Sequence, residues 1–447
     1  MSKYNSSSLI FNSIFGKKVQ AHFDGGQVTS DAGILLLRET ERHERLIPHF
    51  ARCIDDRRSP SHVRHKLEDL LTQRIFQIAA GYEDGNDCND LRSDPSLKLA
   101  AGRLPLSGKD LASQPTISRF ENSIRRSDLI RIGYGLVDHF VTSYRKPPSL
   151  IVLDFDDTDD ETHGMQQLSL FNPYYDSHCY LPLHVYEGIS GKLITSILRP
   201  GKRLTGQQTV AILKRIVKRI RSSWPDTIIL FRGDSHFCSH QILQWCEENN
   251  ILYCVGYPGT TAIKRLAEPL MAEAKSLFAS SKIPATLYET FSYTARNWKN
   301  PRQVVVKVEV NEGKTNLRFL VHNLTEPGPA VIYRTIYSGR GQMENYIKDH
   351  KLGLKSDRTS CHNFIANQFR LFLHSAAYIL MHSLKNNTLK GTQWAKAQFD
   401  TIRLKLFKIG ARVQEMKTKI KFHLPSSFPY KSVLFKISAV FSVIRLT

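Results

Sequence analysis

Residues 149–156 read Ser149-Leu-Ile-Val-Leu-Asp-Phe-Asp156, an apolar run that ends in acidic side chains. A short apolar run rich in branched residues, preceded here by two prolines, is typical of a buried β-strand. Side chains alternate along a strand, so Asp154 and Asp156 are expected on one face and Asp157 on the other. The stretch therefore predicts a core strand that carries carboxylates to the edge of a sheet.

The segments after this strand predict a sheet with crossover helices. In chain order they are strands over 179–186 and 192–198 joined by a tight turn at 188–191, a helix over 206–222, a strand over 227–231, a helix over 239–248 and a strand over 251–255. Three strands followed by two helix–strand units indicate an α/β fold with a mixed sheet and flanking helices.

The remaining sequence is predicted to flank or interrupt this domain. Residues 1–145 are expected to be mostly helical, with Thr29 and Ser30 capping the helix that carries residues 34–37 and a second helix over 62–80. A helix over 113–122, which carries Arg119, suits a recognition helix that lies on DNA. The predicted parts are a helical DNA-binding region (1–145), the first part of the α/β domain (146–257), a β-rich insertion (258–330) with strands over 303–310 and 317–322 around a turn at 311–314, the second part of the domain (331–388) and a basic C-terminal region (389–447).

The composition of the chain points to a nucleic-acid partner. Its 447 residues include 62 Lys and Arg against 41 Asp and Glu, a net charge of +21. Such an excess favours a polyanion, and nucleic acid more than a membrane surface. The 41% of hydrophobic residues excludes a mostly disordered chain.

Targeting and redox signals indicate a cytoplasmic protein. The N-terminal residues are too polar for a secretion signal, and the longest apolar run, 371–384, is shorter than the ~20 residues of a membrane span. That run is predicted to be a buried helix, and no membrane partner is expected. The seven cysteines form no CxxC pair, so they are expected to be reduced thiols.

A second acid follows the predicted strand over 227–231. Asp234 lies in Phe231-Arg-Gly-Asp-Ser-His-Phe237, where ligands of open α/β sheets gather beyond the carboxyl ends of strands. Gly-Asp-Ser is equally an ordinary turn in which the Asp caps a helix. The acids at 159–161 are expected to form a solvated loop.

A third acid lies among cations in a predicted helix over 340–350. Along an ideal helix Tyr337, Arg340, Glu344 and Lys351 fall on a face about 60° wide, with Lys348 close by. An exposed ion-pair face is the alternative, because residues 340 and 344 are one helical turn apart.

Together, the three acids predict a site for two divalent cations. Mg²⁺ prefers hard oxygen ligands, and paired ions that bridge a scissile phosphate promote in-line phosphodiester attack. The surrounding Lys and Arg would hold the DNA backbone.

The chain resembles the DDE-type insertion-sequence transposases with a ribonuclease-H-like catalytic core. More narrowly, it is similar to the branch with a Tyr-(2)-Arg-(3)-Glu-(6)-Lys signature (the IS4-like superfamily, IS1380-type branch), which Tyr337, Arg340, Glu344 and Lys351 match at every position. The stretches around Asp156 and Asp234 look like its first two acidic regions.

The resemblance implies a set of residue roles. The catalytic acids and metal ligands would be Asp156, Asp234 and Glu344. Asp156 is preferred as the first acid because Thr158 follows two residues later, and Asp154 is the alternative on the same face. DNA contacts are expected from Tyr337, Arg340, Lys348, Lys351 and Arg119, with Trp298 of the insertion able to stack on a flipped base.

The resemblance also implies a reaction and its partners. The expected activity is cleavage at transposon ends and joining to target DNA, with two Mg²⁺ ions, or Mn²⁺ in their place. The expected partners are double-stranded DNA, as terminal inverted repeats and target, and further copies of the chain in a homodimer or larger synaptic complex. The expected location is the bacterial cytoplasm, at the nucleoid.

Two other functions fit parts of the sequence. Asp154-x-Asp156-x-Thr158 also matches the haloacid-dehalogenase phosphatase motif, but Asp234 is not followed by the second acid which that class needs. A transposase-derived protein that binds DNA without cutting it is the other alternative.

Overall fold

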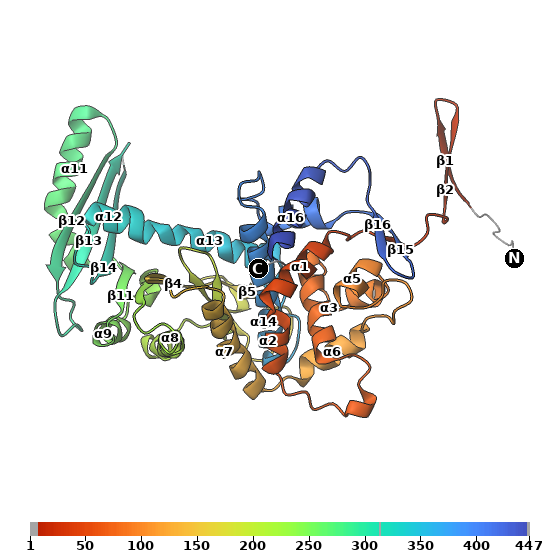
Figure 1. The fold of residues 1–447 in the computed structure, drawn as a ribbon. Coiled ribbons are helices and arrows are strands. Elements are labelled where there is room, and N and C mark those ends of the chain that lie inside the picture. The colour runs from red at the N-terminus through yellow and green to blue at the C-terminus, as the bar shows by residue number, and fades with distance from the viewer. Residues whose placement is uncertain (1–7, 313, 445–447) are drawn as a thin grey trace. The chain divides into compact units, whose positions relative to one another are not determined.

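A computed structural model describes residues 8–312 and 314–444 (Figure 1). The chain divides into two compact units. Unit 1 comprises residues up to 51, 56–121 and 380 onward, and unit 2 comprises 52–55 and 122–379. Unit 2 holds the predicted acids.

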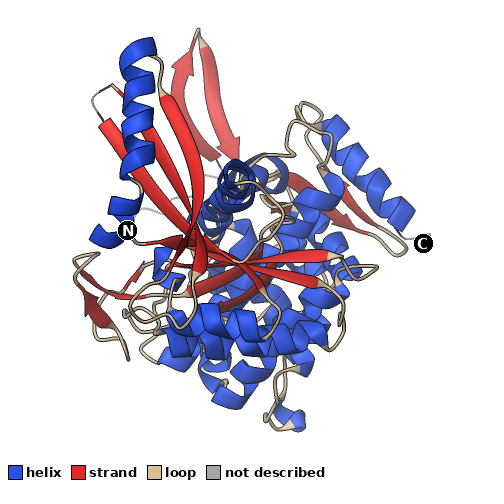
Figure 2. Cartoon of the chain, turned by 90° about the vertical axis from the view of Figure 1, so that its left-hand side faces the viewer, coloured by secondary structure: helices blue, strands red, loops and turns tan. Residues whose placement is uncertain are grey.

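An eight-stranded mixed sheet forms the centre of unit 2, with strand order β12-β13-β14-β11-β10-β4-β8-β9 (Figure 2). Its strands are β4 (Leu150–Asp157), β8 (Leu183–Glu187), β9 (Leu193–Ile197), β10 (Ile228–Gly233), β11 (Leu252–Tyr257), β12 (Ala285–Tyr293), β13 (Arg302–Asn311) and β14 (Lys314–His322). The neighbours β4, β10 and β11 are parallel, and the other pairs are antiparallel. The predicted mixed α/β sheet is confirmed.

The prediction of a single strand over 179–186 is wrong. Two strands occupy it, β7 (Ser177–Tyr180) and β8, separated by Leu181 and Pro182. Proline has no backbone N–H to donate to a strand ladder, so pairing is interrupted there. Strand β7 joins a small sheet with β5 (Asp160–Glu161) and β6 (Leu170–Asn172).

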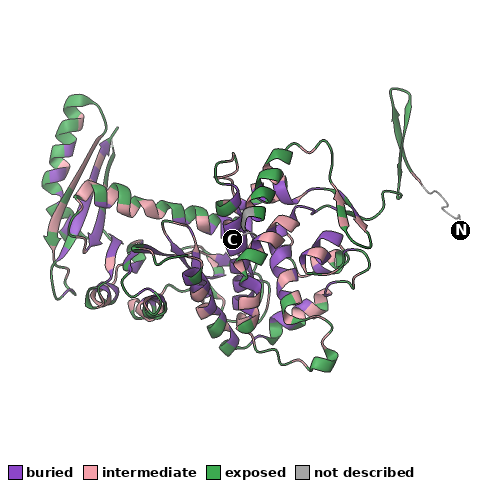
Figure 3. Cartoon of the chain, in the orientation of Figure 1, coloured by how far each residue is buried: buried purple, intermediate pink, exposed green. Residues whose placement is uncertain are grey.

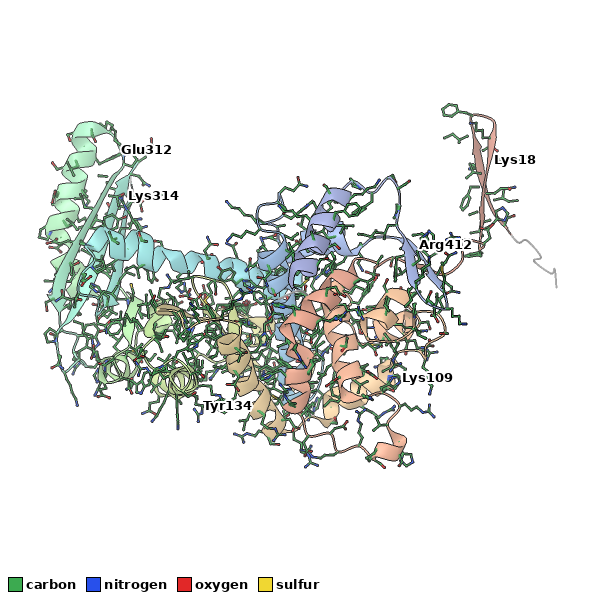
Figure 4. The ribbon with its side chains drawn as sticks, in the orientation of Figure 1. Lys18, Lys109, Tyr134, Glu312, Lys314 and Arg412 are labelled. Atoms are coloured by element: carbon green, nitrogen blue, oxygen red, sulfur yellow. The ribbon has the colours of Figure 1, made fainter. Side chains whose placement is uncertain are left out.

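The segment predicted as an insertion extends the sheet. Strand β14 pairs antiparallel with β11, and β12, which the sequence analysis missed, closes the edge. Figure 4 labels Glu312 and Lys314 near the far end of the β13–β14 hairpin. The turn predicted at 311–314 includes Gly313, which lies outside the described residues.

The alternation of side chains along β4 divides the core of unit 2 between two faces of the sheet. Odd-numbered residues such as Leu153 and Phe155 pack against helices α7 (Arg126–Thr142), α8 (Gly206–Arg221) and α9 (His240–Glu248). On the other face, Val152 and Leu230 contact Ile332 of a helical segment that begins at α12 (Pro329–Val331). Both central strands are therefore buried on two faces.

That segment changes its helical form along its length. It passes from α12 through a π-helical turn (Ile332–Tyr337) and a 3-10 turn (Ser338–Arg340) into α13 (Gly341–Lys348), and ends in a second π-helical turn (Asp349–Gly353). Figure 1 shows α12 and α13 within one helical rod. The other helices of unit 2 are α10 (Thr261–Leu266), α11 (Glu268–Ser281) and the first part of α14 (Phe364–Thr388), with a 3-10 turn at Ser235–Phe237.

Unit 1 is mainly helical. Its elements include α1 (Ile34–Glu44), α2 (Leu46–Arg52), α3 (Leu67–Ala80), α4 (Asp87–Leu91), α5 (Pro95–Ala100), α6 (Gln114–Ser123), α15 (Phe399–Ile402) and α16 (Lys431–Ile444). Strand β3 (Val28–Thr29) pairs with β15 (Ala411–Glu415), which pairs with β16 (Ile420–His423), so the two ends of the chain share one small sheet.

Three predictions for this region need correction. Thr29 and Ser30 do not cap α1, which starts at Ile34 after an N-cap at Gly33. The Thr29 hydroxyl instead accepts a hydrogen bond from the Asp31 amide. Helix α3 starts at Leu67 rather than at 62. A hairpin of β1 (Ser8–Ile14) and β2 (Lys17–His22) precedes the helices, and Figure 3 colours it as exposed.

Within residues 8–312 and 314–444, no helix combines the length and the apolar character required to cross a membrane. The apolar run over 371–384 is a buried part of α14, as predicted. All seven cysteines are free thiols.

Candidate active site

Asp154 is held by an arginine on the neighbouring strand. Only 1% of Asp154 is exposed, and its two carboxylate oxygens accept hydrogen bonds from Nε and Nη2 of Arg232, each at 2.6 Å. Burial raises the pKa of Asp154, and the Arg232 guanidinium opposes that rise. Asp154 is almost fully buried and both its oxygens face one arginine, whereas the Asp156 side chain is 16% exposed, so this geometry favours Asp156 over Asp154 as the first acid.

Asp156 lies two residues further along the same face. Its Oδ2 is 2.7 Å from Nη2 of Arg340, and its Oδ1 accepts a hydrogen bond from the Asp157 amide at 3.1 Å. Burial raises the pKa of Asp156 to about 7. Arg340 opposes the rise, and the charges of Asp234 and Asp157 add to it. The carboxylate therefore lies among others of the same sign.

Asp234 lies directly beyond β10, at the end where β4 also finishes. The parallel register pairs residue 154 with 232, which brings Asp156 and Asp234 to the same edge. Asp234 Oδ1 accepts a hydrogen bond from the His236 amide at 2.9 Å, and Oδ2 lies 2.9 Å from His236 Nδ1. Asp234 thus caps a 3-10 turn while it faces Asp156, so the two interpretations from sequence are compatible.

Asp157 belongs to this acidic group as well. Burial raises its pKa, and the nearby charge of Asp234 raises it further. Alternation along the strand predicts that Asp157 points away from Asp156. The charge of Asp234 nevertheless raises the pKa of both Asp156 and Asp157, because Asp234 lies beyond the end of the strands rather than on one face.

Tyr337 and Arg340 cover these acids. A Cβ on Gly256 of β11 would lie 2.8 Å from the Tyr337 hydroxyl and 2.9 Å from the Ser235 amide nitrogen. Burial opposes the charge of Arg340, but the carboxylates of Asp156 and Asp234 raise its pKa overall. Arg340 is therefore the shared electrostatic partner of the two acids.

Glu344 does not join them in this conformation. Its side chain is exposed on α13, as is that of Lys348. Within the part of the chain that the structure describes, no three His, Cys, Asp or Glu side chains are grouped to hold a metal ion. The stretch from Tyr337 to Lys351 is not one ideal α-helix, because a 3-10 turn precedes α13 and a π-helical turn follows it, so the ideal projection does not describe the whole stretch.

Lys351 binds a loop of its own unit. Its ammonium group donates to the Asp159 backbone carbonyl and lies 2.9 Å from Asp159 Oδ1 and 3.4 Å from the Thr158 hydroxyl. The solvated loop predicted at 159–161 is wrong, because only 1% of Asp160 is exposed and burial raises its pKa well above the usual value. These contacts anchor the segment that follows β4.

Two predicted DNA contacts lie elsewhere. Arg119 belongs to α6 of unit 1, where it donates to the Thr116 hydroxyl at 3.4 Å. Trp298 is only 8% exposed, and its ring lies 5.5 Å from that of Tyr257. In this conformation Trp298 is a core residue of the β-rich segment, so base stacking by Trp298 would require its side chain to leave that core.

Sequence reasoning missed Arg232 and His236, which contact the acids directly. Both lie in the quoted stretch 231–237, where only Asp234 was assigned a role. The signal for Arg232 was its place in the strand before Asp234, since parallel pairing of the two predicted strands brings position 232 beside position 154. No comparable signal marked His236.

Comparisons with known proteins identify the family. The model of the family described as "Transposase DDE domain group 1" matches residues 11–445. No curated protein matches the sequence. Among solved structures, the chain is similar to a piggyBac transposase in a synaptic complex with hairpin DNA, with a TM-score of 0.43 and 12% identity, over 85% of this chain and 80% of that one.

Proposed function

The chain belongs to the DDE transposase family, and from this premise we propose that it cuts DNA at the ends of a mobile element and joins those ends to target DNA. The observation that carries the proposal is the meeting of Asp156 and Asp234 at the ends of two parallel strands, beneath Arg340. The order β9-β8-β4-β10-β11, with the last three parallel, supports a ribonuclease-H-like core.

The acidic residues suit divalent cations. Asp156, Asp157 and Asp234 offer hard carboxylate oxygens, and their mutual repulsion is only partly offset by Arg340. Two Mg²⁺ ions, or Mn²⁺ ions, would activate the attacking hydroxyl and stabilise the leaving oxygen. Asp156 and Asp234 would hold them. Glu344, one helical turn beyond the Arg340 that contacts Asp156, is the proposed third acid.

The chain's own cations would bind and orient DNA. Tyr337 and Arg340 lie over the two acids, where the scissile phosphate must come. Lys348 is exposed on the next turn of α13. Lys351 holds Asp159, so its role in DNA binding requires that this contact open. Arg119 of α6, in unit 1, is also proposed to bind DNA. The proposed assembly is a homodimer or larger synaptic complex on the two transposon ends.

One observation favours a second candidate, a family member that binds DNA without cutting it. Glu344 is exposed and does not complete a three-acid group in the described structure. The phosphatase alternative has no such support. Asp154, the nucleophile it requires, is buried and paired with Arg232.

A nicking assay tests the proposal. The substrate is a plasmid that carries both ends of the mobile element encoding this chain, incubated with Mg²⁺ or Mn²⁺. Glu344→Gln should lower cleavage by about 10³-fold or more while DNA binding persists, because it removes a carboxylate charge without changing shape. Glu273→Gln, on the exposed side of α11, is the matched control and should cleave normally. Equal cleavage by wild type and Glu344→Gln would remove Glu344 from the site, and absence of cleavage by the wild type would favour the binding protein.

A further inference from the structure

We propose that Asp154 and Arg232 form a buried clamp that positions the helical segment bearing Tyr337 and Arg340. The structural part of this inference stands by itself, and its effect on DNA cleavage rests on the proposed function. With Asp156 as the proposed first acid, neither Asp154 nor Arg232 is a proposed ligand of metal or DNA, so the clamp would act through the groups that it holds.

Three contacts of the Arg232 guanidinium build the clamp. Its Nε and Nη2 bind the two oxygens of Asp154 at 2.6 Å each, in a planar fork that only arginine can supply. Its Nη1 donates to the backbone carbonyl of Ile336. Arg232 is 4% exposed, so all three contacts are shielded from water.

The third contact falls where the helical form changes. Ile336 belongs to the π-helical turn that ends at Tyr337, and a 3-10 turn follows from Ser338 to Arg340. Because the Ile336 carbonyl is held at this junction, it determines the rotation of the following residues about the helix axis. Tyr337 is one residue beyond the fixed carbonyl and Arg340 is four, so the direction of both side chains depends on it.

Two glycines let the backbone close around the pair. A Cβ on Gly188, in the turn between β8 and β9, would overlap Nη2 of Arg232 and Oδ2 of Asp154. A Cβ on Gly339 would lie 2.9 Å from Nη1 of Arg232. The strand side and the helix side therefore approach the same guanidinium, which couples the position of the helix to the sheet.

A purely stabilising role explains these contacts less well. Replacing both members of a buried ion pair by apolar residues of similar volume is often neutral or stabilising, whereas removal of one member leaves a costly unpaired charge. An apolar pair would fill the same space on β4 and β10 but could not bind the Ile336 carbonyl. The clamp would thus be needed for geometry more than for stability.

The first test measures the geometry directly. The double variant Asp154→Leu/Arg232→Met keeps the site filled, and hydrogen exchange followed by mass spectrometry reports the amides of residues 330–345. We expect exchange there to accelerate at least tenfold, with the midpoint of thermal unfolding close to that of the wild type. Unchanged protection over 330–345 would overturn the proposal.

The matched control is another buried pair that also binds backbone carbonyls. Arg74 on α3 contacts Glu121 at 2.8 Å and donates to the Glu83 carbonyl at 2.8 Å, within unit 1. Arg74→Met/Glu121→Leu should leave exchange over 330–345 as in the wild type. Acceleration there by this control as well would show general loosening and would also overturn the clamp.

The second test measures the nicking rate at saturating DNA. The clamp predicts that Asp154→Leu/Arg232→Met loses cleavage by at least 100-fold while its affinity for end DNA changes little. Wild-type cleavage by the double variant would mean that the pair positions nothing needed for the reaction. If the wild type itself does not nick, the proposed function fails, and the exchange result still decides the clamp.

Discussion

At the scale of single residues, the candidate site is an alternation of acids and cations. Asp154 is paired with Arg232, Asp156 with Arg340, and Lys351 with Asp159. Two cations that the signature assigns to DNA, Arg340 and Lys351, are thus bound to carboxylates of the chain itself. In the proposed function, DNA phosphate would have to compete with these internal pairs.

The pairing of Arg340 with Asp156 predicts a pH-dependent effect on stability. A buried acid whose folded-state pKa is raised loses its stabilising contribution as pH rises from its ordinary pKa towards the folded value, here about 7. Arg340→Met removes the cation that opposes this rise, so the loss should continue above pH 7. We expect Arg340→Met to lower the free energy of unfolding more at pH 8.5 than at pH 5.5, as measured by denaturant titration.

The comparison needs a control for general loss of packing. Arg334→Met removes an exposed arginine from the same helical segment. The Nε of Arg334 donates a hydrogen bond to the Tyr288 hydroxyl at 3.1 Å. It should destabilise equally at both pH values. A pH-independent effect of Arg340→Met would contradict an ionic pair between Arg340 and Asp156.

At the scale of elements, the irregular helix between Ile332 and Gly353 decides what reaches the acids. Its first part packs on β10 and β11, and its last turn carries His350 into the core beside His184 of β8. The two imidazole rings are 4.8 Å apart, and His350 donates to or accepts from the hydroxyls of Ser356 and Ser375. Both ends of the segment are therefore fixed to the sheet.

Close approach of the helix to β11 predicts a strong effect of one methyl group. Gly256→Ala would place a Cβ 2.8 Å from the Tyr337 hydroxyl and 2.9 Å from the Ser235 nitrogen, so the helix or the turn after Asp234 must shift. We expect Gly256→Ala to lower the free energy of unfolding by about 1–3 kcal/mol. The nicking rate should fall by at least the factor that corresponds to the same free energy.

The paired control for this substitution is Gly341→Ala. Its Cβ would meet no atom within 4 Å, and alanine favours the helix by up to about 1 kcal/mol over glycine. Thermal unfolding and nicking are measured for both variants. Normal nicking by Gly256→Ala would show that the position of Tyr337 is not critical.

The buried histidine pair predicts acid sensitivity of unit 2. Burial, with the charge of Lys351 as a second cause, lowers the pKa of His184 to about 3, and burial lowers that of His350 well below the usual value. In the unfolded chain both protonate near pH 6.5, so their contribution is fully present above that pH and is lost as pH falls. The loss is up to about 1.4 kcal/mol per pH unit for each histidine.

Replacement of one histidine tests this linkage. In His184→Gln the amide can still bond to the Ser196 hydroxyl, which His184 Nδ1 contacts at 2.9 Å, but cannot titrate. Between about pH 6 and 4, the slope of the unfolding free energy against pH should fall by the contribution of one proton, about 1.4 kcal/mol per pH unit, relative to the wild type. An unaltered slope would mean that His184 is protonated in the folded chain.

At the scale of the whole molecule, the net charge would govern the proposed encounter with DNA. A net charge of +21 predicts binding that weakens steeply with salt, because each neutralised phosphate adds about 0.9 to the slope of log affinity against log salt concentration. Lys348→Ala should reduce that slope by about 1 and weaken binding to all sequences alike. Fluorescence anisotropy over a salt series measures both quantities, and a slope unaffected by the substitution would remove Lys348 from the DNA contact.

Much of the fold and part of the site were predictable because they depend on local order. Periodicity along 149–156 and 206–222 depends only on how side chains alternate in a strand or a helix, so β4 and α8 were found with errors of one residue. Parallel strands end at one edge, so the meeting of Asp156 with Asp234 followed from their positions after two strands. Strand β12 and the hairpin over 8–22 were missed although each pairs with the next strand along the chain, because the tendency of a segment to form a strand depends on the side chains it packs against more than on its own residues.

The sequence by itself determined the chemistry present: which acids end strands, which cations share the signature, and how much positive charge faces a polyanion. Only the tertiary structure decided their partners. Arg232 and Asp154 are 78 residues apart, Lys351 and Asp159 are 192 apart, and only folding brings each pair together. The exposure of Glu344 on α13 is likewise a property of the folded chain. The physical reason is that local patterns set the direction of a side chain along its own element, whereas the partner it meets depends on how distant elements pack.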